Sequence, residues 1–368
     1  MDKIRILIST SSGFKKREGI STVIYDYFSR FNKDLFEIHI VVDGEYNTDL
    51  IDLFRESGII VDFLHSRKKE LKKYIADLDK LFKSKKFDVL YANGSSALMA
   101  IELTVAAING CRIRVVHSHN TTCDYKKIDR VLRPYFYFLC TDAFACGQEA
   151  GKWLFGKRNF TIIRNGRDIS KYSFDEVKRR KVRQQMKVSD DCLLVGHVGN
   201  FNQQKNHHFV LEVFKEIIGL KENAKLYLIG SGVLLDEIKQ LASEMGISDK
   251  VVFTGSISNV DEMLQAMDVM FLPSLHEGLP LVVVEWQIAG LPCLISDNVT
   301  RECAFTNLVQ FKSLDSSSIE WAKDVIGLSK MNRRKEAIEA YGKALESGYD
   351  INRSVAELQQ LFLDLLNN

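Results

Sequence analysis

The sequence lacks three features, each of which would have assigned it to a narrow class of protein. Its 368 residues carry 50 lysines and arginines against 48 aspartates and glutamates, so the formal net charge is only +2, whereas a dedicated nucleic-acid-binding protein usually has a larger basic excess. No stretch approaches the roughly 18 consecutive apolar residues of a membrane span. No hydrophobic signal-peptide segment follows the first residues, which favours a cytoplasmic location.

The seven cysteines include no pair with Cys-x-x-Cys spacing, and several lie inside apolar runs such as residues 291–295. An odd number of cysteines in this setting is typical of reduced, buried thiols. We therefore expect a cytosolic protein without disulfides and without a cysteine-bound metal.

Length and composition favour a globular protein of two domains. Hydrophobic residues make up 46% and charged residues 27% of the chain, which is ordinary globular composition, and its length is about twice that of an average domain of ~150 residues. The charge is distributed unevenly, because 28 basic residues accompany 21 acidic ones in residues 1–168, against 22 and 27 in the remainder. A basic first half indicates an anionic partner for the first domain.

Short apolar runs alternate with helical patterns along almost the whole sequence, which is typical of parallel sheets covered by helices on both faces. The expected strands of a first series lie at residues 4–8, 36–42, 59–64, 89–92, 113–117, 143–146 and 161–163. Those of a second series lie at residues 193–198, 226–229, 251–253, 269–272 and 293–296. The sequence therefore predicts an α/β protein with two Rossmann-like domains, whose ligands bind beyond the carboxyl ends of the strands in a central cleft.

The expected boundaries follow from composition. The first domain covers residues 1–168, and the polar segment 169–190, with Lys178-Arg-Arg-Lys181 near its middle, is the expected linker. The second domain covers residues 191–340. Residues 341–368 have a helical pattern and no strand, so we expect a helix that crosses back to the N-terminal domain.

The strongest local pattern is Phe-Leu-Pro-Ser-Leu-His-Glu-Gly-Leu-Pro-Leu-Val-Val-Val-Glu at residues 271–285. A buried strand runs into a polar loop, and Pro280 stands at or just before the first helical position, where its missing N–H costs nothing. The free N–H groups and positive dipole of this helix start make an anion site. Glu285 follows three valines and would need a partner if buried. The alternative is a surface charge at Glu277 and a structural hydrogen-bonding role for Glu285.

This segment, with Glu277, Glu285 and the following Ala-Gly-Leu-Pro, resembles the signature of retaining GT-B glycosyltransferases of family 4. Other segments resemble that family in the same order along the chain, at residues 163–166, 198–207, 228–232 and 252–255. Each segment alone is a weak signal, whereas five in the correct order are a strong one, and the resemblance covers essentially the whole chain. The similarity is strongest to the bacterial capsular and exopolysaccharide branch.

The resemblance implies an enzyme that moves a sugar from a UDP-linked nucleotide sugar to a hydroxyl of a lipid-linked or polysaccharide acceptor, with retention of anomeric configuration. Capsule, exopolysaccharide and O-antigen biosynthesis are the implied settings. Lys205, Glu277 and His119 are the implied catalytic residues. The implied donor-binding residues are Gly199, Asn200, Lys205, Gly230, Gly232, Gly255, Ser256, Val260, Glu277, Gly278, Leu279, Pro280, Leu281 and Glu285.

In the family, a lysine at the position of Lys205 neutralises the donor diphosphate, and most members pair it with an arginine directly after the glycine. Here that position is Asn200, which removes one positive charge from the site of the leaving group. Either Arg301 or the helix start at residues 278–281 compensates for the lost charge, or turnover is slow. The alternative for Lys205 is a solvated loop charge.

The Gly-Ser-Gly at residues 230–232 is an incomplete dinucleotide fingerprint, because Leu235 occupies the place of the third glycine. The resemblance instead implies a turn of close approach near the donor. It also implies that residues 255–260 line the base, Glu285 holds the ribose hydroxyls and Glu277 holds a hydroxyl of the donor sugar.

Two histidines, His117 and His119, end an expected strand of the first domain and would share one face of it. They could be half of a metal site, although no third ligand is evident. The resemblance makes His119 the acceptor-domain histidine close to the transferred sugar, and a structural hydrogen bond is the alternative. The acceptor side further includes Gly19, Asn120 and Asn165, and the loop before Gly19 carries Lys15-Lys-Arg17.

No metal or other cofactor is expected. The Asp-x-Asp pair of the other large glycosyltransferase architecture would bind a divalent metal, but the pair found here, Asp77 and Asp79, lies inside a helical stretch. That stretch, residues 67–86, has an apolar stripe and a lysine-rich face. We expect a surface helix docked on its own sheet, and a basic edge that meets anionic lipid headgroups is the sharper alternative.

Two rival functions remain compatible with the sequence. A nucleotide-sugar 2-epimerase would share the two-domain plan and the nucleotide sugar but use no acceptor. A non-catalytic sugar-nucleotide-binding partner is conceivable because of Asn200.

Overall fold

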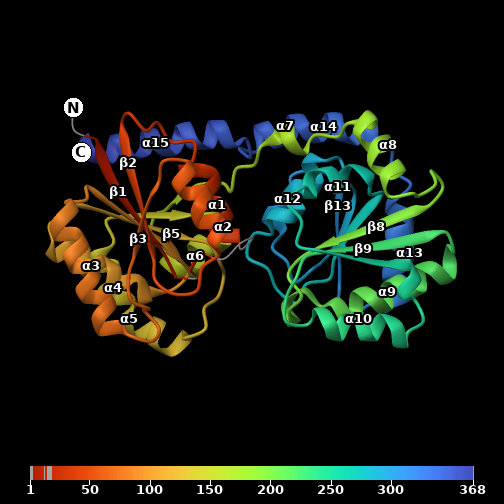
Figure 1. The fold of residues 1–368 in the computed structure, drawn as a ribbon, viewed down its shortest axis with the longest axis horizontal. Coiled ribbons are helices and arrows are strands. Elements are labelled where there is room, and N and C mark those ends of the chain that lie inside the picture. The colour runs from red at the N-terminus through yellow and green to blue at the C-terminus, as the bar shows by residue number, and fades with distance from the viewer. Residues whose placement is uncertain (1–2, 12, 15–18, 368) are drawn as a thin grey trace. The chain divides into compact units, whose positions relative to one another are not determined.

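The computed structural model describes residues 3–11, 13–14 and 19–367. The chain divides into two compact units, one formed by residues 1–167 with 348–368 and the other by residues 168–347. Figure 1 shows a twisted sheet flanked by helices in each unit.

In the first unit, the described residues form a seven-stranded parallel sheet in the order β3-β2-β1-β4-β5-β6-β7. Its central strands are largely buried and rich in valine and isoleucine, as parallel strands covered on both faces usually are. The strand bounds are β1 Ile4–Thr10, β2 Phe36–Val42, β3 Ile60–Phe63, β4 Val89–Gly94, β5 Ile113–Ser118, β6 Asp142–Ala145 and β7 Thr161–Ile162.

Helices cover both faces of this sheet. Those of the first unit are α1 Gly19–Phe28, α2 Thr48–Glu56, α3 Leu71–Lys85, α4 Ala100–Ile108, α5 Lys126–Leu139, α6 Gln148–Phe155 and α15 Ile351–Asn367, with a 3-10 turn η1 at Ala97–Met99. One hydrophobic core lies between the sheet and α3, α4, α5 and α6. On the other face, α15 packs beside α1 (Figure 1), where the buried ring of Phe362 contacts those of Phe31 and Tyr91.

In the second unit, the described residues form a six-stranded parallel sheet in the order β10-β9-β8-β11-β12-β13. Its strands are β8 Leu193–Val198, β9 Ala224–Ile229, β10 Val251–Gly255, β11 Val269–Leu272, β12 Cys293–Ser296 and β13 Val309–Lys312. Its helices are α7 Ile169–Tyr172, α8 Glu176–Gln185, α9 His207–Leu220, α10 Leu235–Glu244, α11 Val260–Ala266, α12 Leu281–Ile288, α13 Ser318–Leu328 and α14 Arg333–Glu346, with 3-10 turns η2 Gln203–Lys205, η3 Ser248–Lys250 and η4 Arg301–Cys303.

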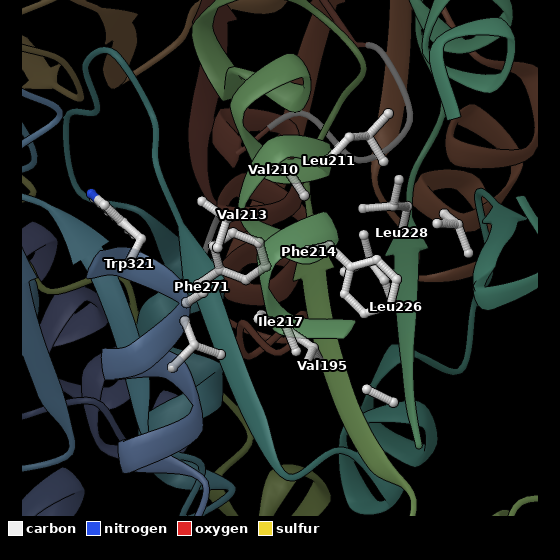
Figure 2. Close-up of a cluster of buried hydrophobic side chains, with 14 of the residues drawn as sticks. Val195, Val210, Leu211, Val213, Phe214, Ile217, Leu226, Leu228, Phe271 and Trp321 are labelled. Atoms are coloured by element: carbon white, nitrogen blue, oxygen red, sulfur yellow. The ribbon is translucent and has the colours of Figure 1, made fainter. Parts of the chain in front are cut away.

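The core of the second unit lies between the sheet and α9, α10 and α13. Figure 2 shows Phe214 and Ile217 of α9 near Val195 and Leu226 of the central strands, with Trp321 of α13 at the other end of the same cluster. The indole N–H of Trp321 donates to the Ser313 carbonyl at 3.0 Å, so this large ring is buried without an unpaired polar atom. The rigid sheet that results holds the loops at the carboxyl ends of its strands.

The structure differs from the predicted boundaries in two places. The predicted linker 169–190 belongs to the second unit, because Arg179 and Arg183 of α8 form ion pairs with Asp268 at 2.5 and 3.3 Å. The predicted single C-terminal helix is two helices: α14 ends in the second unit, and α15 belongs to the first. The turn between them contains Gly348 at a φ of 75°, a conformation that favours glycine.

Candidate active site

The order of strands in the second unit defines a topological switch point between β8 and β11. From β8 the chain winds outward through β9 and β10, and from β11 it winds the other way through β12 and β13. In open parallel sheets, ligands bind beyond the carboxyl ends of the strands at this point. The loops concerned are residues 199–206 after β8 and 273–280 after β11.

Each of these two loops contributes one member of an ion pair. The Nζ atom of Lys205 lies 2.6 Å from Oε1 of Glu277. The side chains are only 14% and 10% exposed, so the pair is largely removed from water. Lys205 ends η2, where the side chain of Asn202 accepts a hydrogen bond from its backbone N–H at 3.1 Å. The two predicted catalytic residues of this unit are therefore in direct contact.

Three further hydrogen bonds join the same two loops. The backbone N–H of Leu275 donates to the Gln204 carbonyl at 2.8 Å, the Gln204 amide donates to the His276 carbonyl at 2.9 Å, and the Asn206 amide donates to the Pro273 carbonyl at 3.2 Å. No roles were predicted for Gln204 and Asn206 from the sequence. The sequence did contain one signal of an ordered turn here: Asn202 stands three residues before Lys205, and asparagine is a preferred N-cap.

The glycines of the loop after β9 serve a close contact between backbones. A Cβ atom on Gly232 would lie 2.5 Å from the carbonyl oxygen of Phe201, and one on Gly230 would overlap the carbonyl oxygen of Gly199. Both glycines have positive φ angles, 155° and 147°. The loop after β9 therefore packs against the loop that carries Lys205, as a turn of close approach that no larger residue can make.

The loop after β10 continues this arrangement. Gly255 has a φ of 66° and its carbonyl accepts from the N–H of Gly230 at 3.0 Å, while the hydroxyls of Ser256 and Ser231 lie 2.9 Å apart. Val260 is the first residue of α11. The predicted donor-binding residues Gly199, Gly230, Gly232, Gly255 and Ser256 thus share one edge of the sheet with Lys205.

The helix that follows Glu277 starts where the sequence predicted. Pro280 is the N-cap of α12 and Leu281 its first residue, and the backbone N–H of Val283 reaches back to the Pro280 carbonyl at 3.1 Å. Leu279 and Pro280 are buried and Gly278 is partly exposed. Glu285 follows one turn into the helix and is buried, at 9% exposure. Backbone N–H groups and two carboxylates therefore lie within one short segment.

Two buried histidines flank Lys205. The ring of His207 stacks on that of Phe201 with centroids 4.0 Å apart, and the ring of His197 contacts the His207 ring edge-on. Burial, with Lys205 and His208 adding to it, lowers the pKa of His207 to about 3, and burial also puts the pKa of His197 well below its usual value. Both rings are neutral, so Lys205 supplies the positive charge at this point of the site.

In the first unit, His119 follows β5, and its Nε2 atom lies 3.0 Å from the side-chain oxygen of Asn93. Its ring packs on His117, whose Nδ1 atom lies 2.5 Å from the Tyr91 hydroxyl. Burial lowers the pKa of His119 to about 3, and burial with the neighbouring His119 puts that of His117 well below its usual range. Each ring thus has a side-chain partner within hydrogen-bond distance, and the described residues contain no group of three potential metal ligands.

The other predicted acceptor residues, Gly19, Asn120 and Asn165, come from separate parts of the first unit. Asn120 accepts a hydrogen bond from the N–H of Thr121 at 2.8 Å. Asn165 is buried, and its side-chain oxygen has no hydrogen-bond partner among the described residues. Gly19 is the first residue of α1. The basic residues Lys15, Lys16 and Arg17 lie outside the described residues.

Comparison with known proteins decides the family. Residues 178–344 match the family model of glycosyl transferases group 1. The chain is 32% identical over 269 residues to EpsF of Bacillus subtilis, a protein named as a glycosyltransferase, with 70% of each chain covered. The chain belongs to the group 1 glycosyltransferases.

This glycosyltransferase is also 24% identical to an Escherichia coli enzyme named UDP-Gal:alpha-D-GlcNAc-diphosphoundecaprenol alpha-1,3-galactosyltransferase, with 91% of this chain and 93% of the relative covered. The crystal structure of HepE from Anabaena in complex with UDP superposes with a TM-score of 0.79 at 18% identity, covering 98% of this chain and 100% of HepE. The predicted family and the predicted GT-B fold of two Rossmann-like domains are confirmed.

Asn200, which stands where the resemblance predicted an arginine, is exposed in the loop before Lys205. Arg301, one of the predicted substitutes for the missing arginine, packs its guanidinium over the Phe311 ring at 4.5 Å. The start of α12, the other predicted substitute, adjoins Glu277 in the chain.

The Asp-x-Asp pair of the glycosyltransferase lies on α3 of the first unit, as predicted. Asp77 accepts hydrogen bonds from the backbone and ring of His65, and Asp79 pairs with Lys83 at 2.6 Å. Within the described ranges, no helix has both the length and the apolar composition required to cross a membrane.

Proposed function

We propose that this glycosyltransferase transfers a sugar from a UDP-linked donor to a hydroxyl of a lipid-diphosphate-linked acceptor, with retention of anomeric configuration, in the synthesis of a capsular or extracellular polysaccharide. The observation that carries the proposal is the pair of Lys205 and Glu277 at the switch point of the second sheet, 2.6 Å apart. It joins a cation suited to a diphosphate with a carboxylate suited to a sugar hydroxyl.

The donor diphosphate is the group that must be stabilised as the bond to the sugar breaks. Lys205 provides a positive charge in a site with little water, where it acts more strongly than in bulk solvent. The N–H groups and the positive dipole at the start of α12 supply further stabilisation. This combination supports departure of UDP without an arginine at position 200.

The carboxylates position the donor. Glu277 holds a hydroxyl of the transferred sugar and keeps the Lys205 ammonium in place, and the buried Glu285 binds the ribose hydroxyls. Because the acceptor hydroxyl attacks on the face that the diphosphate leaves, the departing phosphate oxygen takes its proton. The protein then contributes orientation and electrostatic stabilisation rather than a covalent nucleophile.

The nature of the substrates is inferred from relatives and from charge. HepE binds UDP in its crystal structure, and the Escherichia coli relative is named for UDP-galactose and for an acceptor linked to diphosphoundecaprenol. The first half of this chain has a basic excess, which suits a diphosphate-bearing acceptor. His119, held neutral by burial, is suited to donate or accept a hydrogen bond beside the transferred sugar without adding charge.

Transfer without a metal ion is part of the proposal. The carboxylates of Asp77 and Asp79, both on α3, are engaged by His65 and Lys83 respectively, so they are not arranged as a pair of metal ligands. Lys205 and the start of α12 are proposed to take the role that a divalent cation has in other transferases.

A donor panel tests the proposal. Thermal stabilisation by one UDP-sugar above the others identifies the donor, and transfer is then measured to diphosphate-linked lipid acceptors with and without excess chelator. We expect unchanged turnover in chelator and a drop in kcat/KM of at least about 100-fold for Lys205→Ala. The exposed Lys215 of α9 supplies the matched control, Lys215→Ala.

Three outcomes would contradict the proposal. Formation of an epimer from a UDP-sugar alone would indicate a 2-epimerase, and stabilisation by UDP without transfer to any acceptor would indicate a binding partner. A loss below tenfold for Lys205→Ala would remove the lysine from the stabilisation of the transition state.

A further inference from the structure

One helix of the first unit exposes an apolar face that its own core does not cover. Four residues of α5, spaced by three and four positions, are exposed on the same side of the helix, and Val131 and Phe138 reach 77% and 82% exposure. The other two are Ile128 and Tyr135. Contiguous apolar surface of this kind on a folded protein usually marks an interaction site.

The flank of this face is basic. Lys126, Lys127 and Arg130 of the same helix are exposed. The acidic residue of the helix, Asp129, does not offset their charge at the surface, because it is 2% exposed and pairs with Arg133 at 2.8 Å. We call these seven exposed residues of α5 the α5 face: Lys126, Lys127, Ile128, Arg130, Val131, Tyr135 and Phe138.

The opposite side of α5 holds the helix firmly on the unit. Phe136 and Leu139 are buried in the core beneath it, and the Tyr135 hydroxyl lies 3.1 Å from that of Thr104 on α4. Figure 1 places α3, α4 and α5 in one layer on the same side of the sheet. The α5 face is therefore presented by a helix whose orientation is fixed by packing.

The α5 face also lies next to the predicted acceptor residues in the chain. Residues 119–125 connect the carboxyl end of β5 to the start of α5, and they include His119 and Asn120. A surface bound through α5 would be held near the edge of the sheet where ligands of such folds bind.

We propose that the α5 face docks on the surface of a phospholipid bilayer containing anionic lipid, with its apolar and aromatic side chains in the interface and its basic residues against the headgroups. A helix with apolar residues on one arc and lysine or arginine beside it binds anionic bilayers in this way. This membrane proposal depends on the proposed function in one respect, which is that the acceptor is linked to a lipid.

The lysine-rich helix α3 is a weaker candidate for this contact. Tyr74, Leu78 and Phe82 are buried in the core. Two of its exposed lysines, Lys73 and Lys83, are paired with Glu70 and Asp79 at 2.6 Å. The charge predicted for a lipid-facing edge is therefore partly neutralised on α3, and most of its large apolar residues point inward.

Flotation with vesicles of phosphatidylcholine, with and without phosphatidylglycerol, tests the proposal on the full chain without donor or acceptor. We expect binding to the anionic vesicles and a loss of at least about tenfold in the partition coefficient for Val131→Ser/Phe138→Ser. Lys127→Glu/Arg130→Glu should lose about tenfold or more on anionic vesicles. The control Val177→Ser removes an equally exposed valine, 76% exposed on α8, and should bind as the parent does.

Because the substituted residues are exposed, the melting temperature and circular dichroism should not change. Absence of binding to anionic vesicles would overturn the proposal. So would a result in which Lys72→Glu/Lys80→Glu on α3 abolishes vesicle binding while Val131→Ser/Phe138→Ser binds as the parent does. Conversion of a dimer to a monomer by Val131→Ser/Phe138→Ser, with vesicle binding retained, would assign the α5 face to a second copy of the chain.

The two proposals fail separately. If the proposed transfer is wrong, vesicle binding is unaffected because neither substrate is present. If the membrane contact is wrong, transfer to an acceptor with a short, water-soluble lipid still proceeds, and it should be equal for the parent and for Val131→Ser/Phe138→Ser.

Discussion

The Cα of Gly232 approaches the backbone of Phe201 so closely that a Cβ atom there would lie 2.5 Å from the Phe201 carbonyl oxygen. This contact joins the loop after β9 to the loop that carries Lys205. The Phe201 ring in turn stacks on His207, at the start of α9. The position of the proposed diphosphate-binding lysine thus depends on a glycine 27 residues further along the chain.

Replacing Gly232 by alanine should destabilise the second unit by about 2–4 kcal/mol, because the added methyl group meets backbone atoms and the φ of 155° is strained for alanine. Chemical denaturation measures the loss. The matched control is Gly219→Ala in α9, where an added Cβ meets nothing within 4 Å, and which should gain about 0.5–1 kcal/mol. Equal stabilities for the two variants would contradict the close-contact explanation.

The ion pair predicts different effects on stability and on activity. Lys205→Met leaves the carboxylate of Glu277, 10% exposed, without its cation, and should cost about 3 kcal/mol of unfolding free energy. Lys205→Met/Glu277→Leu removes both charges and should recover most of that loss, while kcat/KM stays at least about 100-fold below the parent. Recovery of activity together with stability in the double variant would show that the pair is structural.

His207 predicts a pH dependence of stability. In the unfolded chain its imidazole binds a proton below about pH 6.5, whereas in the folded protein burial lowers its pKa to about 3. The unfolded state therefore gains protons first as the pH falls, and this group should lower the unfolding free energy by about 1.4 kcal/mol per pH unit between pH 6.5 and 3.

The variant His207→Phe keeps the stacking on Phe201 and removes the titration. Between pH 7.5 and 6.5 its unfolding free energy should change in parallel with that of the parent, and between pH 6.5 and 4.5 it should fall less steeply by about 1.4 kcal/mol per unit. Parallel curves would mean that His207 is protonated in the folded state.

Arg333 closes the ends of two helices in the second unit. Its guanidinium donates to the carbonyls of Leu264, Gln265, Met267 and Ala289 at 2.7–3.1 Å. Lysine cannot reproduce this planar set of donors, so Arg333→Lys should cost about 2 kcal/mol or more. The neighbouring Arg334 is exposed, and Arg334→Lys should leave the melting temperature unchanged.

Strand positions could be predicted from the sequence because buried parallel strands are continuous apolar runs. All twelve expected runs coincide with strands β1 to β12. The thirteenth, Val309–Lys312, was missed because its sequence, Val-Gln-Phe-Lys, is short and alternates with polar residues, as suits the edge position it occupies.

The linker was predicted wrongly for a related reason. A run of lysine and arginine indicates a solvated segment, yet Arg183 is 3% exposed and reaches the carbonyl of Cys192 at 2.8 Å and that of Ala266 at 3.0 Å. Composition does not reveal that a long side chain will find buried carbonyl groups to satisfy its donors.

Within the candidate site, the residue types were predictable but their contacts were not. Lys205 and Glu277 are 72 positions apart, and only the parallel order of the strands brings the loops after β8 and β11 together. The hydrogen bonds of Gln204 and Asn206 depend on local loop conformation, including a φ of 56° at Asn206, which no periodic pattern encodes.

Helix α15 has a consequence for biosynthesis. The aromatic pocket around Phe31 and Tyr91 is filled by Phe362, which leaves the ribosome only after the whole contiguous segment 168–347. Domains generally fold as units during synthesis. The first unit, whose residues 1–167 are synthesised first, is therefore completed only when α15 has been synthesised. A nascent chain stalled inside the second unit would carry an open aromatic surface on the first, and this is where chaperones would be expected to bind.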